Sequence, residues 1–72
     1  MTVSQWIIYD HPKDYPDKFV VRRWDIEDGM TTPNSRCDLA GSLDDARLFI
    51  PPGMVRVPPL SGDDTVIAEV WI

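Results

Sequence analysis

The chain has 72 residues, of which seven are Lys or Arg and twelve are Asp or Glu, so its formal net charge is −5 at pH 7. This length allows one domain, over residues 1–72, and is too short for a Rossmann fold, a barrel or a protein kinase. Hydrophobic residues make up 43% of the chain, which is typical of a globular protein and not of a disordered one.

The first part of the chain predicts two strands joined by a loop. Residues Val3 to Tyr9 are rich in β-branched and aromatic side chains, which favour a strand. Residues Asp10 to Asp17 contain two prolines and three aspartates, which favour a loop with turns. Residues Lys18 to Ile26 predict a second strand, antiparallel to the first.

The two-residue period of a strand divides Lys18 to Ile26 into two faces. The more apolar face is expected to lie on the core, and it carries Val20, Arg22, Trp24 and Ile26. Arg22 then has to extend its guanidinium to solvent or lie at the margin of the sheet.

The middle of the chain predicts an irregular segment followed by a helix. Residues Glu27 to Gly41 show little periodicity and contain several turn-forming residues. Ser42 is a favourable N-cap, and apolar residues recur at three- and four-residue spacing up to Ile50, which indicates a helix. Pro51 ends that helix because proline cannot continue it.

The last part of the chain predicts an extended segment from Met54 to Pro59, a turn, and a nearly all-apolar strand from Thr65 to Ile72. We expect an α+β fold, in which one helix packs on a small three-stranded antiparallel sheet in the order β-β-α-β. The expected core consists of Trp6, Ile8, Val20, Trp24, Leu43, Ala46, Phe49, Val66, Ala68 and Val70.

Metal and disulfide chemistry have few residues to use. One cysteine, Cys37, cannot form an internal disulfide, and together with one histidine, His11, it cannot supply a four-ligand zinc site. The chain has no run of about 18 apolar residues that would span a membrane, and no basic segment typical of a signal peptide precedes its first apolar run. We therefore expect a cytoplasmic protein without a cofactor.

The loop from Asp10 to Asp17 is the best place for catalysis or metal binding. Asp10, His11, Asp14 and Asp17 could pair a carboxylate with an imidazole or hold a divalent ion. Their spacing, however, matches no EF-hand or zinc pattern, and aspartates beside prolines are common in turns. No G-x-S-x-G surrounds any serine. The sequence therefore predicts no catalytic, cofactor-binding or metal site, and we expect a protein that is not an enzyme.

The acidic residues are the more informative feature, because ten of the twelve are aspartates and most fall where predicted elements end. One interpretation is solubility and turn formation. The other is an acidic surface that imitates a phosphate backbone and attracts the Lys and Arg side chains of another protein. The candidate partner-binding residues are Asp10, Asp14, Asp17, Asp25, Glu27, Asp28, Asp44, Asp45, Asp63 and Asp64.

Two segments carry a resemblance to known proteins. The segments are W-I-I-Y-D-H-P…F-V-V-R-R-W, within residues 6–24, and V-I-A-E-V-W-I, at residues 66–72. They resemble a group of short bacterial proteins of uncharacterised function, which implies a single bacterial domain and nothing catalytic. In size and acidity the chain is also similar to phage-encoded anti-CRISPR inhibitors, a likeness that implies a class of function and no residue roles.

We therefore expect a non-enzymatic interaction module that docks on a basic protein surface, with inhibition of a nucleic-acid-binding complex of the CRISPR type as one form of that role. Direct binding to nucleic acid or to an anionic membrane is not expected of an acidic chain. The protein is expected to be a monomer or a homodimer formed through an edge strand. The alternatives are a bacterial housekeeping protein whose acidity only keeps it soluble, and a weak metal-binding or hydrolytic site in the loop 10–17.

Overall fold

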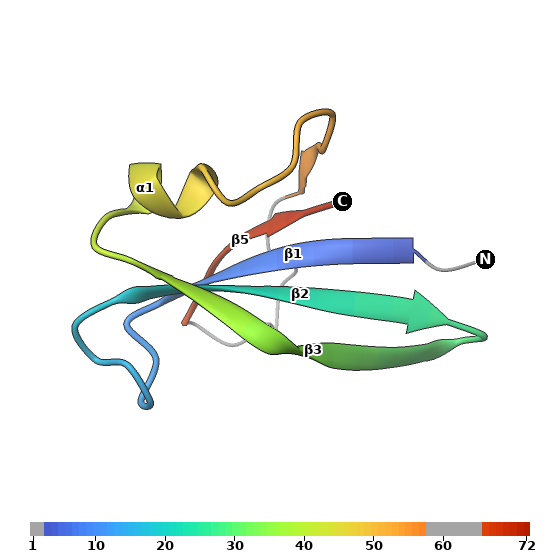
Figure 1. Cartoon of the computed structure of the whole chain (residues 1–72), viewed down its shortest axis with the longest axis horizontal. Coiled ribbons are helices and arrows are strands. Elements are labelled where there is room, and N and C mark those ends of the chain that lie inside the picture. The colour runs from blue at the N-terminus through green and yellow to red at the C-terminus, as the bar shows by residue number, and fades with distance from the viewer. Residues whose placement is uncertain (1–2, 58–65) are drawn as a thin grey trace.

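The computed structural model of the chain describes residues 3–57 and 66–72. These residues form a five-stranded antiparallel sheet with one short helix (Figure 1). In chain order the elements are β1 (Val3–Asp10), β2 (Phe19–Glu27), β3 (Met30–Ala40), α1 (Leu43–Arg47), β4 (Arg56–Val57) and β5 (Ile67–Trp71). The strands lie side by side in the order β3-β2-β1-β5-β4.

The predicted α+β fold with a three-stranded sheet is wrong. The protein is mostly β, because residues expected to be irregular form β3 and because two residues of the extended segment form β4. The two strands predicted before residue 27 are confirmed as β1 and β2, and the final strand is confirmed as β5. The short helix contributes only five residues to the fold.

A tight turn explains why β3 forms where an irregular segment was predicted. Glu27 pairs with Met30, so only Asp28 and Gly29 connect β2 to β3. Both connecting residues have positive φ, 52° at Asp28 and 79° at Gly29, as a type I′ turn requires. This turn matches the right-handed twist of the two strands, and Asp-Gly is one of its most common sequences.

The pairing of β2 with β3 is interrupted once, and this interruption is the reason that the sequence pattern does not predict β3. Arg22 pairs with Cys37 and Trp24 with Pro33, so three residues of β3 lie opposite Arg23 alone. Such a bulge breaks the alternation of apolar and polar residues that identifies a strand. Pro33 is compatible with β3 because β3 is an edge strand, where a missing N–H costs no pairing on the open side.

The other edge of the sheet is β4. Strand β5 pairs with β1 on one side and with β4 on the other, so the final strand lies inside the sheet. The backbones of Val55 and Ile72 extend this pairing with hydrogen bonds of 2.7 and 2.9 Å. A homodimer through an edge strand stays a prediction, and the edges that it would use are β3 and β4.

The helix begins as predicted and ends earlier. The Ser42 hydroxyl accepts a hydrogen bond from the Asp45 N–H at 3.1 Å, which confirms Ser42 as the N-cap. After α1, the N–H groups of residues 48–50 donate to carbonyls three residues earlier, a tighter coil than an α-helix. Pro51 explains this tightening, because a proline disfavours the α conformation of the residue before it. Among the described residues no helix is long and apolar enough to cross a membrane.

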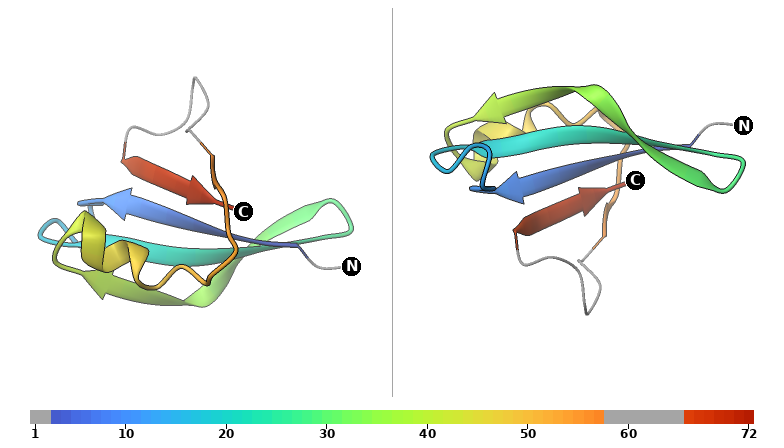
Figure 2. Two further views of the ribbon diagram at one scale, coloured as in Figure 1. Left: turned by 90° about the horizontal axis from the view of Figure 1, so that it is seen from above. Right: turned by 90° about the horizontal axis from the view of Figure 1, so that it is seen from below.

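The main core lies between α1 and one face of the sheet. Figure 2 shows α1 on that face, over β2 and β3. The buried residues of this core are Ile8, Val21, Ala40 and Ala46, and the partly buried residues packed against them are Trp6, Phe19, Leu43, Ile50, Ala68 and Trp71. Of the predicted core, Ile8, Val20 and Ala46 are buried, Trp6, Leu43 and Ala68 pack against the core, Trp24, Val66 and Val70 are half-buried, and Phe49 is exposed.

The face of β2 predicted to meet the core is the wrong one. Val21 pairs with Ile8, so the side chains of both point toward α1. Val20, Arg22 and Trp24 therefore point to the opposite side of the sheet, which we call the helix-free face. Val20 is nonetheless only 4% exposed, so β2 buries apolar side chains on both faces and its pattern does not tell them apart.

Candidate functional site

The fold divides the predicted acidic surface between two ends of the molecule. Because Phe19 pairs with Ala40, the loop 11–18 and the start of α1 lie at one end, the loop end, and the β2–β3 turn lies at the other, the hairpin end (Figure 1). The loop end carries Asp10, Asp14, Asp17, Asp44 and Asp45, and the hairpin end carries Asp25, Glu27 and Asp28. Asp63 and Asp64 lie outside the described residues.

The loop that carries Asp14 and Asp17 has a hydrogen-bonded backbone. Within the loop, the Tyr15 N–H donates to the Pro12 carbonyl at 2.9 Å and the Lys18 N–H donates to the Tyr15 carbonyl at 3.1 Å. The His11 N–H closes the loop by donating to the Lys18 carbonyl at 3.1 Å. A partner that binds here meets groups that are already positioned, which reduces the entropy lost on binding.

Most carboxylates of the loop end face solvent. Asp10 contacts the ring of His11, and Asp44 lies 3.6 Å from the Arg47 guanidinium while 93% of its side chain stays exposed. The carboxylates of Asp14, Asp17 and Asp45 form no ion pair with any side chain of the described residues, and all three residues are exposed. Three exposed carboxylates of the loop end are therefore not held in ion pairs by the described side chains.

At the hairpin end, one of the three predicted residues is used internally. Asp25 accepts hydrogen bonds from the Ser4 hydroxyl at 2.9 Å and from the Arg23 guanidinium at 2.8 Å. The Ser4 bond first and the Arg23 bond second lower the pKa of Asp25. Glu27 and Asp28 remain exposed, so only these two are available to a partner at that end.

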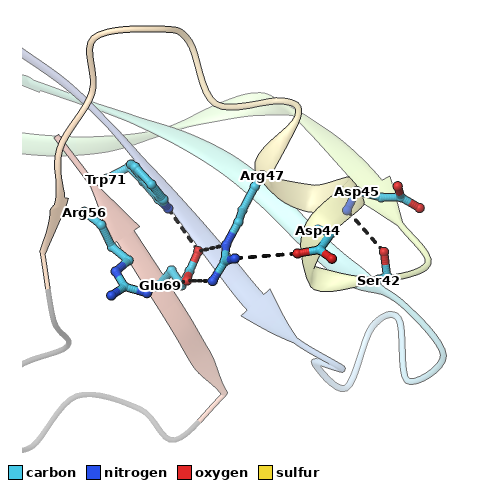
Figure 3. A network of polar contacts seen from close by, with 7 residues as sticks. All are labelled: Ser42, Asp44, Asp45, Arg47, Arg56, Glu69 and Trp71. Carbon is cyan, nitrogen blue, oxygen red and sulfur yellow. Dashed lines mark hydrogen bonds and ion pairs between the residues drawn. The ribbon is translucent and has the colours of Figure 1, made fainter.

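A buried carboxylate that the sequence did not single out lies on the α1 side of the sheet. The Glu69 side chain is 6% exposed and accepts two hydrogen bonds from Arg47, of 3.0 and 2.5 Å (Figure 3). Arg56 and the Trp71 indole N–H add bonds of 3.3 and 3.1 Å. These bonds, first those from Arg47, lower the pKa of Glu69. The cluster joins α1, β4 and β5 and leaves no open position on the carboxylate for a partner.

The helix-free face carries a hollow next to the loop end. Its volume is about 170 Å³, and it is lined by Tyr9, Pro12, Asp14, Tyr15, Val20 and Arg22. The Trp24 indole N–H donates to the Tyr9 hydroxyl at 3.1 Å and holds that side chain in place. Arg22 was predicted to lie on the core face, so this pocket was not predicted. The signal that would have identified it is the pairing of β2 with β1, which the sequence alone does not give.

The loop 10–17 lacks the geometry of a metal site. In the part of the chain that the structure describes, no group of three or more His, Cys, Asp and Glu side chains is arranged to hold a metal ion. His11 contacts Asp10 and packs edge-on against Phe19, with ring centroids 5.0 Å apart. Cys37 is half-buried in β3 opposite Arg22.

Comparison with protein-family models, with curated proteins and with solved structures finds no match. The resemblance to short bacterial proteins and the likeness in size and acidity to anti-CRISPR inhibitors therefore stay predictions.

Proposed function

We propose that this protein is a non-enzymatic interaction module that docks its loop end on a basic surface of another protein. The observation that carries the proposal is the set of exposed carboxylates at Asp14, Asp17 and Asp45, which form no ion pair with the described side chains. Asp14 and Asp17 stand on the hydrogen-bonded loop, and Asp45 stands on the capped first turn of α1. A net charge of −5 adds a long-range attraction toward a basic partner.

Charge complementarity mainly raises the association rate and the specificity of binding. It adds little affinity, because an exposed ion pair contributes only about 0.2–1 kcal/mol to the free energy. An interface also needs apolar or aromatic anchors inside a polar rim. The loop end supplies candidates, since Tyr15 is 38% exposed and Leu39, which pairs with Val20 near the start of β2, is 43% exposed. The partner is therefore expected to present Lys or Arg side chains around an apolar patch.

The binding groove of a nucleic-acid-handling protein fits this description, because its basic side chains are arranged to pair with phosphates. Carboxylates on fixed turns can occupy the same positions. Inhibition of such a complex, including one of the CRISPR type, follows as the proposed consequence of docking. The protein itself does not bind nucleic acid in this scheme.

One observation favours the alternative that the acids only keep the protein soluble. The eight described candidates are divided between the loop end and the hairpin end, and the molecule measures 35 Å along its longest axis. Acids scattered over a surface oppose self-association without any partner. If the acids only keep the protein soluble, loss of charge at either end should have the same effect. If the loop end docks on a partner, loss of charge there should weaken binding more than loss of charge at the hairpin end.

A matched pair of double variants separates the two functions. D17N/D45N removes two exposed carboxylates from the loop end, and E27Q/D28N removes two from the hairpin end, so both variants have the same net charge. Proteins captured from the source cells with the wild-type chain are purified, and their Kd is measured at low and high salt. We expect D17N/D45N to weaken binding about tenfold and E27Q/D28N to change it less than about twofold, with affinity falling as salt rises.

Equal effects of the two variants, or an affinity that salt does not change, would contradict docking through the loop end. Asn at position 28 is a safe control, because Asn tolerates the positive φ of that residue. Solubility of each variant, measured by precipitation, shows whether the loss of charge matters in the absence of a partner.

A further inference from the structure

Arg22 is a half-buried cation of β2 that pairs with no carboxylate in the part of the chain that the structure describes. It lies in the middle of β2, opposite Ile7 of β1 and Cys37 of β3, so its side chain emerges from the centre of the helix-free face. Arg23, Arg47 and Arg56 each pair with a carboxylate. Among the described residues, the Arg22 guanidinium has no hydrogen bond or ion pair.

The hollow beside Arg22 combines this cation with aromatic and apolar walls. Tyr9, Pro12, Tyr15 and Val20 form most of its lining, and Val20 is almost fully buried. The Tyr9 hydroxyl accepts a hydrogen bond from the Trp24 indole, so its own proton is directed to another acceptor. The hollow thus offers a guanidinium and a hydroxyl as donors next to a surface that prefers an apolar group.

We propose that this hollow, the Arg22 pocket, binds a carboxylate that carries an apolar group. The planar guanidinium donates two parallel hydrogen bonds to the carboxylate oxygens, and the Tyr9 hydroxyl adds a third. The apolar group of the ligand packs against Tyr15, Pro12 and Val20. A singly charged carboxylate suits a protein of net charge −5 better than a phosphate dianion, which the same field repels twice as strongly.

Asp14 also lines the hollow, and it decides between an anionic and a cationic ligand. Asp14 is exposed, so water and salt screen its attraction for a cation. Arg22 is half-buried among aromatic side chains, where the dielectric constant is lower and its attraction for an anion is therefore stronger. The pocket is therefore assigned to an anion, with Asp14 weakening the binding and not supporting it.

The inference does not rest on the docking of the loop end. Asp17 and Asp45 do not line the Arg22 pocket, and the variants that test docking leave its lining unchanged. The two proposals can therefore fail independently.

The test uses the full chain labelled with ¹⁵N and titrated with N-acetyl-leucine, which has an apolar group and a free carboxylate. N-acetyl-leucinamide, which lacks the charge, and inorganic phosphate are titrated in parallel. We expect N-acetyl-leucine to shift the amide signals of Tyr9, Tyr15 and Arg22 at millimolar concentration, and the other two compounds to bind at least about tenfold more weakly. Equal responses to the acid and the amide would overturn the proposal.

Variants of the lining show whether the pocket binds an anion or a cation. R22Q is expected to weaken the binding of N-acetyl-leucine about tenfold, and R22K, which keeps the charge but not the paired donors, about threefold. K18Q removes the same charge from an exposed position outside the pocket and is expected to leave the Kd within about twofold. D14N is expected to tighten binding. Tighter binding by R22Q, or weaker binding by D14N, would overturn the proposal in favour of a cation.

A fourth probe assigns the source of the carboxylate. A pentapeptide that ends in leucine with a free carboxylate is compared with N-acetyl-leucine. A Kd at least about tenfold lower for the peptide supports the pocket and assigns it to the C-terminus of a partner protein, whereas an equal Kd supports the pocket and assigns it to a small acid. Binding of the same peptide with an amidated end as tightly as with the free end would contradict the proposal. R22K and the ¹⁵N spectrum keep the test valid if R22Q does not fold.

Discussion

At the scale of single residues, the most consequential side chain is Glu69, the buried carboxylate of β5 on the α1 side of the sheet. Two arginines and an indole bond to it, and its pKa is lowered, first by hydrogen bonds from Arg47. A depressed pKa means that the charged form is stabilised by folding. The free energy of this cluster is therefore fully present above the pKa of the unfolded state and is lost as the pH falls through the lower pKa of the folded state.

The prediction is that E69Q lowers the free energy of unfolding at pH 7 and flattens its dependence on pH. We expect a loss of about 1–3 kcal/mol, because the amide keeps the shape but not the charge that the arginines face. Urea unfolding followed by tryptophan fluorescence from pH 7 to 3 measures both effects. Wild type should lose stability below about pH 4.5, and E69Q should lose less. Asp25, whose pKa is also lowered, contributes to the slope that remains.

The control is E27Q, which changes the same group at an exposed position. Its unfolding free energy should follow that of wild type at every pH. Parallel curves for E69Q and wild type would show that the ion cluster does not stabilise the folded state.

At the scale of elements, the sequence predicts what depends on neighbouring residues and misses what depends on pairing. β1 and β2 follow from their β-branched and aromatic residues, and the cap at Ser42 follows from one hydroxyl. β3 was missed because its bulge interrupts the two-residue period. The Asp28-Gly29 dipeptide was nevertheless a usable signal, since it predicts a two-residue hairpin turn wherever apolar segments flank it.

The geometry of the hairpin turn predicts that a side chain at position 29 destabilises the protein. G29A is expected to lower the free energy of unfolding by about 1–2 kcal/mol, because an L side chain at a φ of 79° approaches the following carbonyl. G41A is the matched control, since a Cβ at Gly41 meets no atom within 4 Å and its φ is not positive. Thermal unfolding measures both variants. A melting temperature that falls equally in the two would indicate a general effect of alanine and not the geometry of the turn.

The candidate site was predictable to a similar degree. That the acids lie in turns or at the start of the helix followed from neighbouring prolines and glycines and from the cap at Ser42, and Asp14, Asp17, Asp28 and Asp45 are indeed exposed. Their division between two ends follows from strand register, which places the β2–β3 turn opposite the loop 11–18. The position of Arg22 depends on the face that α1 covers, which local periodicity does not give.

At the scale of the whole molecule, the sheet is covered unequally but buries side chains on both faces. Helix α1 covers Ile8 and Val21, which are 0% and 1% exposed. On the helix-free face no helix is present among the described residues, yet Ile7 and Val20 are only 8% and 4% exposed. Tyr9 and Trp24, joined by a hydrogen bond, stand on that face and contribute the larger side chains. A protein of this size gains stability by burying apolar side chains on both faces of its central strands.

Val20 and Val21 test this arrangement because they are neighbours on opposite faces and lose the same two methyl groups in a change to alanine. We expect V21A and V20A each to lower the free energy of unfolding by about 1.5–3 kcal/mol, since both side chains are buried. V55A, at a position that is 64% exposed, is expected to cost less than about 0.5 kcal/mol. Urea unfolding of the three variants gives the values.

The two buried variants should differ in a second measurement. Val20 lines the Arg22 pocket and Val21 does not. Under conditions in which both variants are folded, V20A should therefore weaken the binding of N-acetyl-leucine, and V21A should leave its Kd unchanged. If V20A costs no more stability than V55A, the helix-free face is an ordinary surface and the apolar wall of the pocket is not preformed. If V21A weakens the acid as much as V20A does, the binding depends on the stability of the sheet and not on the face that carries Arg22.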